Sequence, residues 1–133
     1  MQPAQFARSY RATAIATATP GHLVLMLFDG ALRSMAIALN GFQDQDIIRR
    51  NEQIHNKLVN AHDILLELQT SLDLKVPGDF PRRMWALYDF MMDQLRQANM
   101  RKDPEPIRVV ERLLGTIRDA WATMLDRSVS HAA

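Results

Sequence analysis

Residues 54–72 read IHNKLVNAHDILLELQTSL, and their apolar side chains recur at alternating spacings of four and three. This is the period of a helix that packs in a bundle, because such spacing brings the apolar residues to one stripe of the helix. The pattern therefore predicts a helix over residues 46–71. Its apolar stripe consists of Ile54, Leu58, Ala61, Leu65, Leu68 and Leu72.

Three further segments have a helical pattern with start and stop signals. Thr19 is the expected N-cap of the first helix and Pro20 its first residue, where the missing N–H costs nothing. Gly41 is a natural stop for that helix, and Asp103-Pro104 repeats the start signal before the last one. The predicted helices cover residues 20–40, 81–100 and 104–126.

No stretch alternates as a strand does, so the predicted fold class is all-α. The longest break is residues 73–80, which contain a Pro-Gly pair. Short connections between long helices favour antiparallel neighbours, which predicts an up-down-up-down four-helix bundle as a single domain over residues 1–133. Residues 1–18 are expected to form a loosely docked N-terminal arm, and residues 127–133 a frayed tail.

Composition excludes several classes of protein. The 16 basic and 15 acidic residues leave a net charge of +1, which predicts binding neither to nucleic acid nor to an acidic membrane surface. Cysteine is absent, which excludes disulfides, a thiolate nucleophile and cysteine-ligated zinc, and which fits a reducing cytoplasm.

The chain is expected to be soluble and cytoplasmic. Its first residues, MQPAQFARSY, lack the apolar core of a secretory signal. The longest strongly apolar run, Leu23 to Phe28, is far shorter than the roughly 20 residues of a membrane span. No membrane insertion is therefore predicted.

Two enzymatic interpretations of a helical bundle are weak in this sequence. A di-metal site needs two Glu-x-x-His motifs, and only Glu52–His55 matches, off the apolar stripe of its helix. His55 and His62 share a helix face as a phosphotransfer site would, but Asn60 and Ala61 stand where a small glycine is needed for a partner to approach. We expect a solvated pair of histidines, no catalysis, no metal and no cofactor.

The helices carry more apolar surface than their main stripes. Periodicity supports two explanations equally, a wide core or a groove that waits for another helix. The residues concerned are Val59, His62 and Leu66 in the second helix, Trp85, Tyr88 and Met92 in the third, and Val109, Leu113 and Ala120 in the fourth.

Three blocks resemble the flagellar secretion chaperones of the FliS family. They are TATPGHLVLMLFDGA at residues 17–31, LYDFM at 87–91 and IRDAW at 117–121, with Tyr10 upstream where that family has a tyrosine. In order they span nearly the whole chain. The sequence departs from the family at Phe28, where a tyrosine is usual, so a polar contact is in doubt there.

The resemblance implies a partner and a mode of action. Members of the family form antiparallel bundles and bind the C-terminal segment of flagellin, which wraps around them and partly folds into helices. Binding keeps flagellin from polymerising and delivers it to the export gate of the flagellar type III apparatus.

On this interpretation the partner-binding residues are two residues of the arm together with the surplus apolar residues of the helices. Three alternatives stay open for the arm: it covers the cargo surface in the free protein, it is a disordered terminus without effect, or its Tyr10 contacts flagellin or the export gate. The predicted residues are Tyr10, Ile15, Val59, His62, Leu66, Trp85, Tyr88, Met92, Val109 and Leu113.

Overall fold

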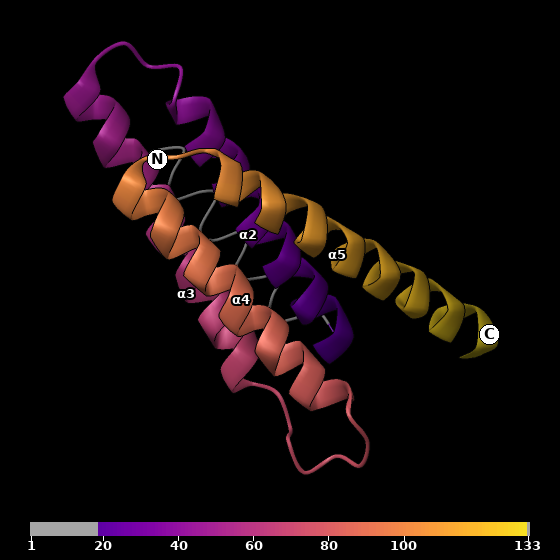
Figure 1. Cartoon of the computed structure of the whole chain (residues 1–133). Helices are drawn as coiled ribbons and strands as arrows, with labels where there is room; N and C mark the ends of the chain where they lie inside the picture. The colour runs from indigo at the N-terminus through magenta and orange to yellow at the C-terminus, as the bar shows by residue number, and fades with distance from the viewer. Residues whose placement is uncertain (1–18, 133) are drawn as a thin grey trace, which may run out of the picture.

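The computed structural model describes the backbone of residues 19–132 and the side chains of residues 19–128. It contains four helices, and no strand occurs within these limits, so the predicted all-α class is confirmed (Figure 1). The helices are α2 (Pro20–Gly41), α3 (Ile47–Thr70), α4 (Phe80–Arg101) and α5 (Glu105–Ala132).

The helices form an antiparallel bundle in which α2 packs against α3 and α5, and α4 packs against the same two helices. Each connection reverses the chain, so that successive helices run up, down, up and down (Figure 1). The longest connection joins α3 to α4 between Thr70 and Phe80. The predicted topology is therefore confirmed.

All four helices contribute to one hydrophobic core. The stripe predicted for α3 is buried from Ile54 to Leu68, and Leu72 packs against the core just beyond the helix end. The largest fully buried side chains are Phe28, Met35, Ile54, Leu58, Leu65, Met91, Leu95, Ile107, Val110 and Leu114.

Side-chain caps define where α2 and α3 begin. Thr19 is the N-cap of α2, and its Oγ1 accepts a hydrogen bond from the backbone N–H of His22 at 3.3 Å. Asp46 caps α3, and its Oδ1 accepts from the backbone N–H of Ile48 at 3.1 Å and of Arg49 at 3.2 Å. Each cap satisfies backbone donors that have no partner within the helix.

Gly41 does not act as the stop that the sequence predicts. It is the last residue of α2 and is buried, and the C-cap is Phe42 in a right-handed conformation. A Cβ at Gly41 would lie 3.4 Å from Cγ1 of Ile54, at the limit of ordinary van der Waals contact between α2 and α3. The left-handed cap occurs instead at Lys102 after α4, where φ is 51°.

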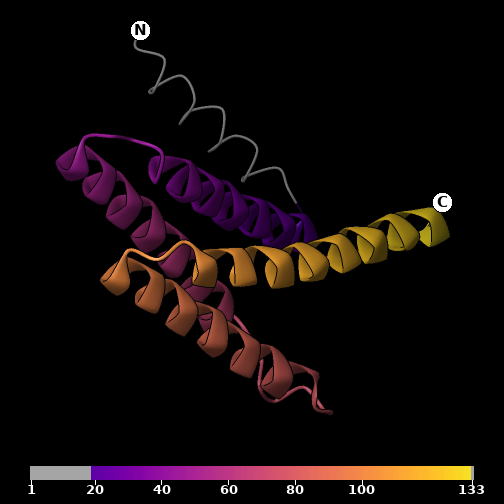
Figure 2. The same cartoon turned by 45° about the horizontal axis from the view of Figure 1, so that its top comes forward.

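The helix α5 runs on to Ala132, past the predicted end at residue 126, so the expectation of a frayed tail is wrong for residues 127–132. Neither glycine nor proline follows Gly115 to stop the helix. Its second half leaves the bundle and diverges from the first residues of α4 (Figure 2). As a consequence Met124, which continues the apolar spacing of Ile107, Val110 and Leu114 along α5, is exposed, whereas those three residues are fully buried.

Candidate partner-binding surfaces

A buried glutamine fixes the register between α3 and α4. Gln69 Nε2 donates to the backbone oxygen of Trp85 at 3.1 Å and to Oδ1 of Asp89 at 2.7 Å. Burying an amide side chain is favourable only when it is hydrogen-bonded, and both of these partners lie on α4. Gln69 therefore ties the end of α3 to the start of α4.

The two histidines of α3 bridge to α4 further along. Nδ1 of His55 lies 2.9 Å from Nδ2 of Asn99, and Nε2 of His62 lies 3.1 Å from a guanidinium nitrogen of Arg96. Amide and guanidinium nitrogens only donate, so both histidine nitrogens accept. His55 is exposed and His62 partly buried, and each ring also contacts a side chain of α4.

The di-metal interpretation finds no support in the described part of the chain. Glu52 and His55 both point to solvent, as predicted from their position off the stripe. Among residues 19–128, no group of three or more His, Asp or Glu side chains is arranged to hold a metal ion.

The first candidate surface is an open groove of about 230 Å³ between the outer edges of α3 and α4. Apolar side chains form much of its lining, and the polar bridge between His62 and Arg96 crosses it. We call it the α3/α4 groove. It is lined by Leu58, Val59, His62, Leu95, Arg96 and Asn99.

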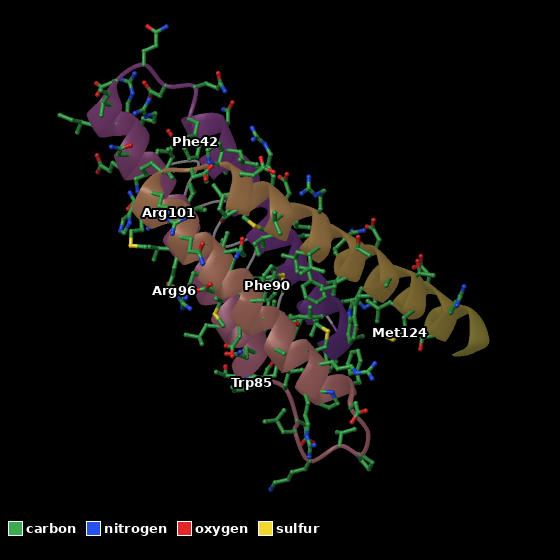
Figure 3. The ribbon with its side chains drawn as sticks, in the orientation of Figure 1. Phe42, Trp85, Phe90, Arg96, Arg101 and Met124 are labelled. Carbon is green, nitrogen blue, oxygen red and sulfur yellow. The ribbon has the colours of Figure 1, made fainter. Side chains whose placement is uncertain are left out.

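Exposed apolar residues continue the α3/α4 groove along both helices. Val59 and Leu66 are exposed and lie two helical turns apart on the face of α3 that carries His62. On α4, Trp85 and Arg96 lie along the same edge of the helix (Figure 3). The result is an exposed row of large apolar side chains beside the polar bridges.

The second candidate surface is a larger open cleft of about 470 Å³ where the start of α4 and the second half of α5 diverge. We call it the terminal cleft. Its lining is mostly aromatic and aliphatic, with Ser71 and Asp73 as the polar side chains, and comes from all four helices or their ends: Val24, Phe28, Leu68, Ser71, Leu72, Asp73, Phe80, Met84, Tyr88, Ile117, Ala120, Trp121 and Met124.

Contacts between α5 and α2 account for this divergence. Nε1 of Trp121 donates to the backbone oxygen of Gly21 at 2.8 Å, and Nε of Arg118 donates to Oδ1 of Asp29 at 2.8 Å. Leu125 packs so closely on Gly21 that a Cβ there would lie 2.6 Å from its Cδ2. These contacts draw the second half of α5 towards α2, so the space beside α4 stays open.

An aromatic pair and an ion pair accompany this arrangement. The ring of Phe28 is buried and meets Trp121 edge to face, with ring centroids 6.4 Å apart and an interplanar angle of 83°. The position that departs from the family thus keeps its aromatic packing. In the ion pair, the hydrogen bond to Asp29 raises the pKa of Arg118. On the opposite side of the terminal cleft, burial raises the pKa of the Tyr88 phenol to about 12.

The structure divides the predicted binding residues into several groups. Val59 and His62 line the α3/α4 groove, whereas Leu66 and Trp85 are exposed on α3 and α4 outside its lining. Met92 is buried in the core, as the wide-core explanation expects, and Tyr88 is almost fully buried but lines the terminal cleft. Val109 and Leu113 are partly buried on α5, which packs against α2 and α4. Tyr10 and Ile15 lie outside the described residues.

Sequence reasoning missed most of the terminal cleft. Phe80 and Met124 are exposed on its two walls, and Met84 lies between them on the α4 side. The available signal was an excess of apolar residues around the break before α4, where Leu74, Val76 and Phe80 are all exposed. The spacing within a helix does not reveal that its neighbour diverges.

Among the helices described, α2 alone is long and apolar enough to cross a membrane. The core helices of soluble proteins can have the same length and composition. The helix supplies Phe28, Ala31, Met35 and Ala38 to the buried core, and further apolar residues of α2 pack against that core while partly exposed.

The fold is an antiparallel helical bundle that carries two open apolar surfaces. The chain belongs to the family described as "Flagellar protein FliS", whose model matches residues 2–128. The resemblance inferred from the three sequence blocks is therefore confirmed, and the family is one of secretion chaperones rather than of enzymes.

Relatives named flagellar secretion chaperone FliS occur in several bacteria. The chain is 34% identical to that of Bacillus subtilis over 113 residues, which cover 85% of this chain and 80% of the relative. It is 35% identical to that of Salmonella typhimurium over 109 residues, covering 82% and 78%. It is 34% identical to that of Escherichia coli over 113 residues, covering 85% and 81%.

Proposed function

We propose that this protein is a cytoplasmic export chaperone that binds the C-terminal segment of flagellin, prevents its premature polymerisation and delivers it to the gate of the flagellar export apparatus. Membership of the family supports the role in flagellar secretion. The row of exposed apolar side chains along the α3/α4 groove is the observation that supports binding of a helix.

The α3/α4 groove suits an amphipathic helix. Ile48, Val59 and Leu66 lie on the outward side of α3, and the first and last are about 27 Å apart at the rise of roughly 1.5 Å per residue. A client helix of similar length can place apolar side chains over this row at intervals of three and four residues. His62 and Arg96 beside the row offer polar partners to the edge of that helix.

Coupled folding and binding fits the task of a secretion chaperone. A client segment that is unfolded before it binds must be ordered, and this cost offsets part of the energy gained by burying apolar surface. Affinity then comes from many modest contacts rather than from one deep pocket, so that the client can later be released. While the segment is bound, its apolar face is unavailable for assembly with other flagellin molecules.

The test is calorimetry of the protein with full-length cognate flagellin and with flagellin that lacks its C-terminal segment. We expect one-to-one binding of the full-length protein, a negative heat-capacity change from apolar burial, and no binding after truncation. Equal binding of the truncated flagellin would reject the C-terminal segment as the ligand. The lack of any interaction with full-length flagellin would reject the proposal.

A pair of variants tests the α3/α4 groove itself. Val59 and Phe90 are similarly exposed, at 40% and 45%, but Val59 lines the α3/α4 groove whereas Phe90 lines neither candidate surface. We expect Val59→Asp to weaken flagellin binding about tenfold or more, and Phe90→Asp to change it by less than about threefold. Equal effects of the two variants would show that the groove has no special part in binding.

A further inference from the structure

The α3/α4 groove has a single permanent charge in its lining. Among the described residues that line it, this charge belongs to Arg96, which lies on the edge of α4 that faces away from α5 (Figure 3). The Arg96 side chain is 60% exposed. A long basic side chain of this kind packs its aliphatic stem on apolar surface and keeps its charged end in water. The groove therefore combines an apolar lining, supplied by Leu58, Val59 and Leu95, with one positive charge at its rim.

His62 fixes the position of this charge. Its Nε2 lies 3.1 Å from Nη1 of Arg96 and accepts the hydrogen bond, so in the neutral ring the proton is on Nδ1. Nδ1 lies 3.9 Å from Oδ1 of Asp63, which favours this tautomer. The partly buried ring is thus oriented by the carboxylate on one side and orients the exposed guanidinium on the other.

The described part of the chain uses only some of the hydrogen-bonding capacity of Arg96. A guanidinium has five N–H donors, and His62 accepts from one nitrogen. The other terminal nitrogen lies 3.7 Å from Oδ1 of Asp93, one turn earlier on α4, and an exposed pair at this distance contributes little. The second oxygen of Asp93 accepts from Nε2 of Gln97 at 2.8 Å. Arg96 can therefore donate to a further carboxylate.

We propose that Arg96 is a specificity-determining residue of this chaperone, which binds an aspartate or glutamate of the client helix beside the apolar side chain that enters the α3/α4 groove. The carboxylate lies three or four residues from that side chain, because residues at this spacing share a helix face. This inference rests on the proposed chaperone function and names the charge that the site requires of its client. Apolar contacts alone discriminate weakly between amphipathic helices, whereas a fixed positive charge attracts an acidic residue and repels a basic one.

Neutralisation tests the charge, with a matched control on the same helix. Arg83 is also exposed and faces a carboxylate one turn away, that of Asp79 at 3.8 Å, but it lines neither candidate surface. We expect Arg96→Gln to weaken binding of full-length cognate flagellin about threefold to tenfold, and Arg83→Gln to change it by less than about twofold. The loss in Arg96→Gln should diminish when the salt concentration is raised from about 0.05 M to about 0.5 M, since exposed charges are screened. Equal losses in the two variants would mean that only the net charge matters, and would overturn the role of Arg96.

A double-mutant cycle identifies the carboxylate. Each aspartate and glutamate in the C-terminal segment of flagellin is exchanged in turn for asparagine or glutamine, and the affinity is measured for the parent protein and for Arg96→Gln. We expect one exchange to weaken binding to the parent protein as much as Arg96→Gln does, and to have no further effect in that variant. Arg96→Glu should then bind best to flagellin that carries lysine at the identified position. If no exchange is coupled to Arg96, the proposal is wrong.

Two substitutions of His62 test its positioning role. His62→Leu removes the acceptor, and His62→Gln keeps an amide oxygen that can accept from Arg96. We expect His62→Leu to weaken binding of parent flagellin about threefold but not that of flagellin without the identified carboxylate, and His62→Gln to recover most of the loss. Equal weakening of both flagellins by His62→Leu would contradict the positioning role. Circular dichroism of each variant checks that the helices are intact.

The Val59→Asp variant separates this inference from the proposed function. Binding that is lost in Val59→Asp but unchanged in Arg96→Gln would overturn the role of Arg96 and leave the proposed function intact. The lack of any binding by the parent protein would reject both.

Discussion

Replacing Trp121 by phenylalanine should loosen the attachment of α5 to α2. The indole N–H donates to the backbone oxygen of Gly21 at 2.8 Å, and phenylalanine cannot form this bond. The net contribution of such a hydrogen bond is about 1 kcal/mol. The smaller ring also keeps only part of the edge-to-face contact with Phe28, a contact worth roughly 0.5–1.5 kcal/mol.

These two losses place the destabilisation by Trp121→Phe at about 1–2 kcal/mol. No large cavity term is added, because Trp121 is only partly buried and water can enter the vacated space. For a domain of this length the change corresponds to a decrease in Tm of roughly 3–8 °C. The decrease should appear in urea unfolding followed by circular dichroism, with an unchanged dependence on urea concentration.

The second tryptophan provides a matched control. Trp85 is exposed, and its indole N–H has no hydrogen-bond partner among residues 19–128. We therefore expect Trp85→Phe to change the free energy of unfolding by less than about 0.5 kcal/mol. If the two substitutions prove equally mild, or if Trp85→Phe is the more destabilising, the indole bond to Gly21 does not hold α5 against α2.

Two further predictions concern stability. Gly115 lies within α5, and a Cβ there would meet no atom within 4 Å, so Gly115→Ala should raise the free energy of unfolding by about 1 kcal/mol in thermal melts. A loss of stability would mean that the glycine serves a contact. Burial raises the pKa of Tyr88 to about 12. The neutral phenol is thus favoured in the folded state, and this stability is complete below about pH 10 and lost as the pH rises towards 12. Comparison of alkaline unfolding between the parent protein and Tyr88→Phe isolates this loss, and identical curves would contradict it.

The sequence determined the helices and the family. The cap at Thr19 and the apolar spacing from Ile54 to Leu68 depend on residues within a few positions of each other. They could therefore be interpreted without knowing which helix packs against them. The blocks that suggested the family extend over three of the helices, and the match to residues 2–128 confirms them. The place of Val59 and Leu66 on the outward side of α3 followed from the same periodicity.

The tertiary structure alone decided which apolar stripes are covered. Periodicity gives the direction of a side chain around its own helix, but not the distance or angle to the next helix. Tyr88 and Met92 are therefore buried, although the sequence suggested that they form surplus apolar surface on α4. Met124 is exposed, although it continues the apolar spacing of α5. The contact between Trp121 and Gly21 joins residues far apart in the sequence, and by drawing α5 towards α2 it opens the terminal cleft.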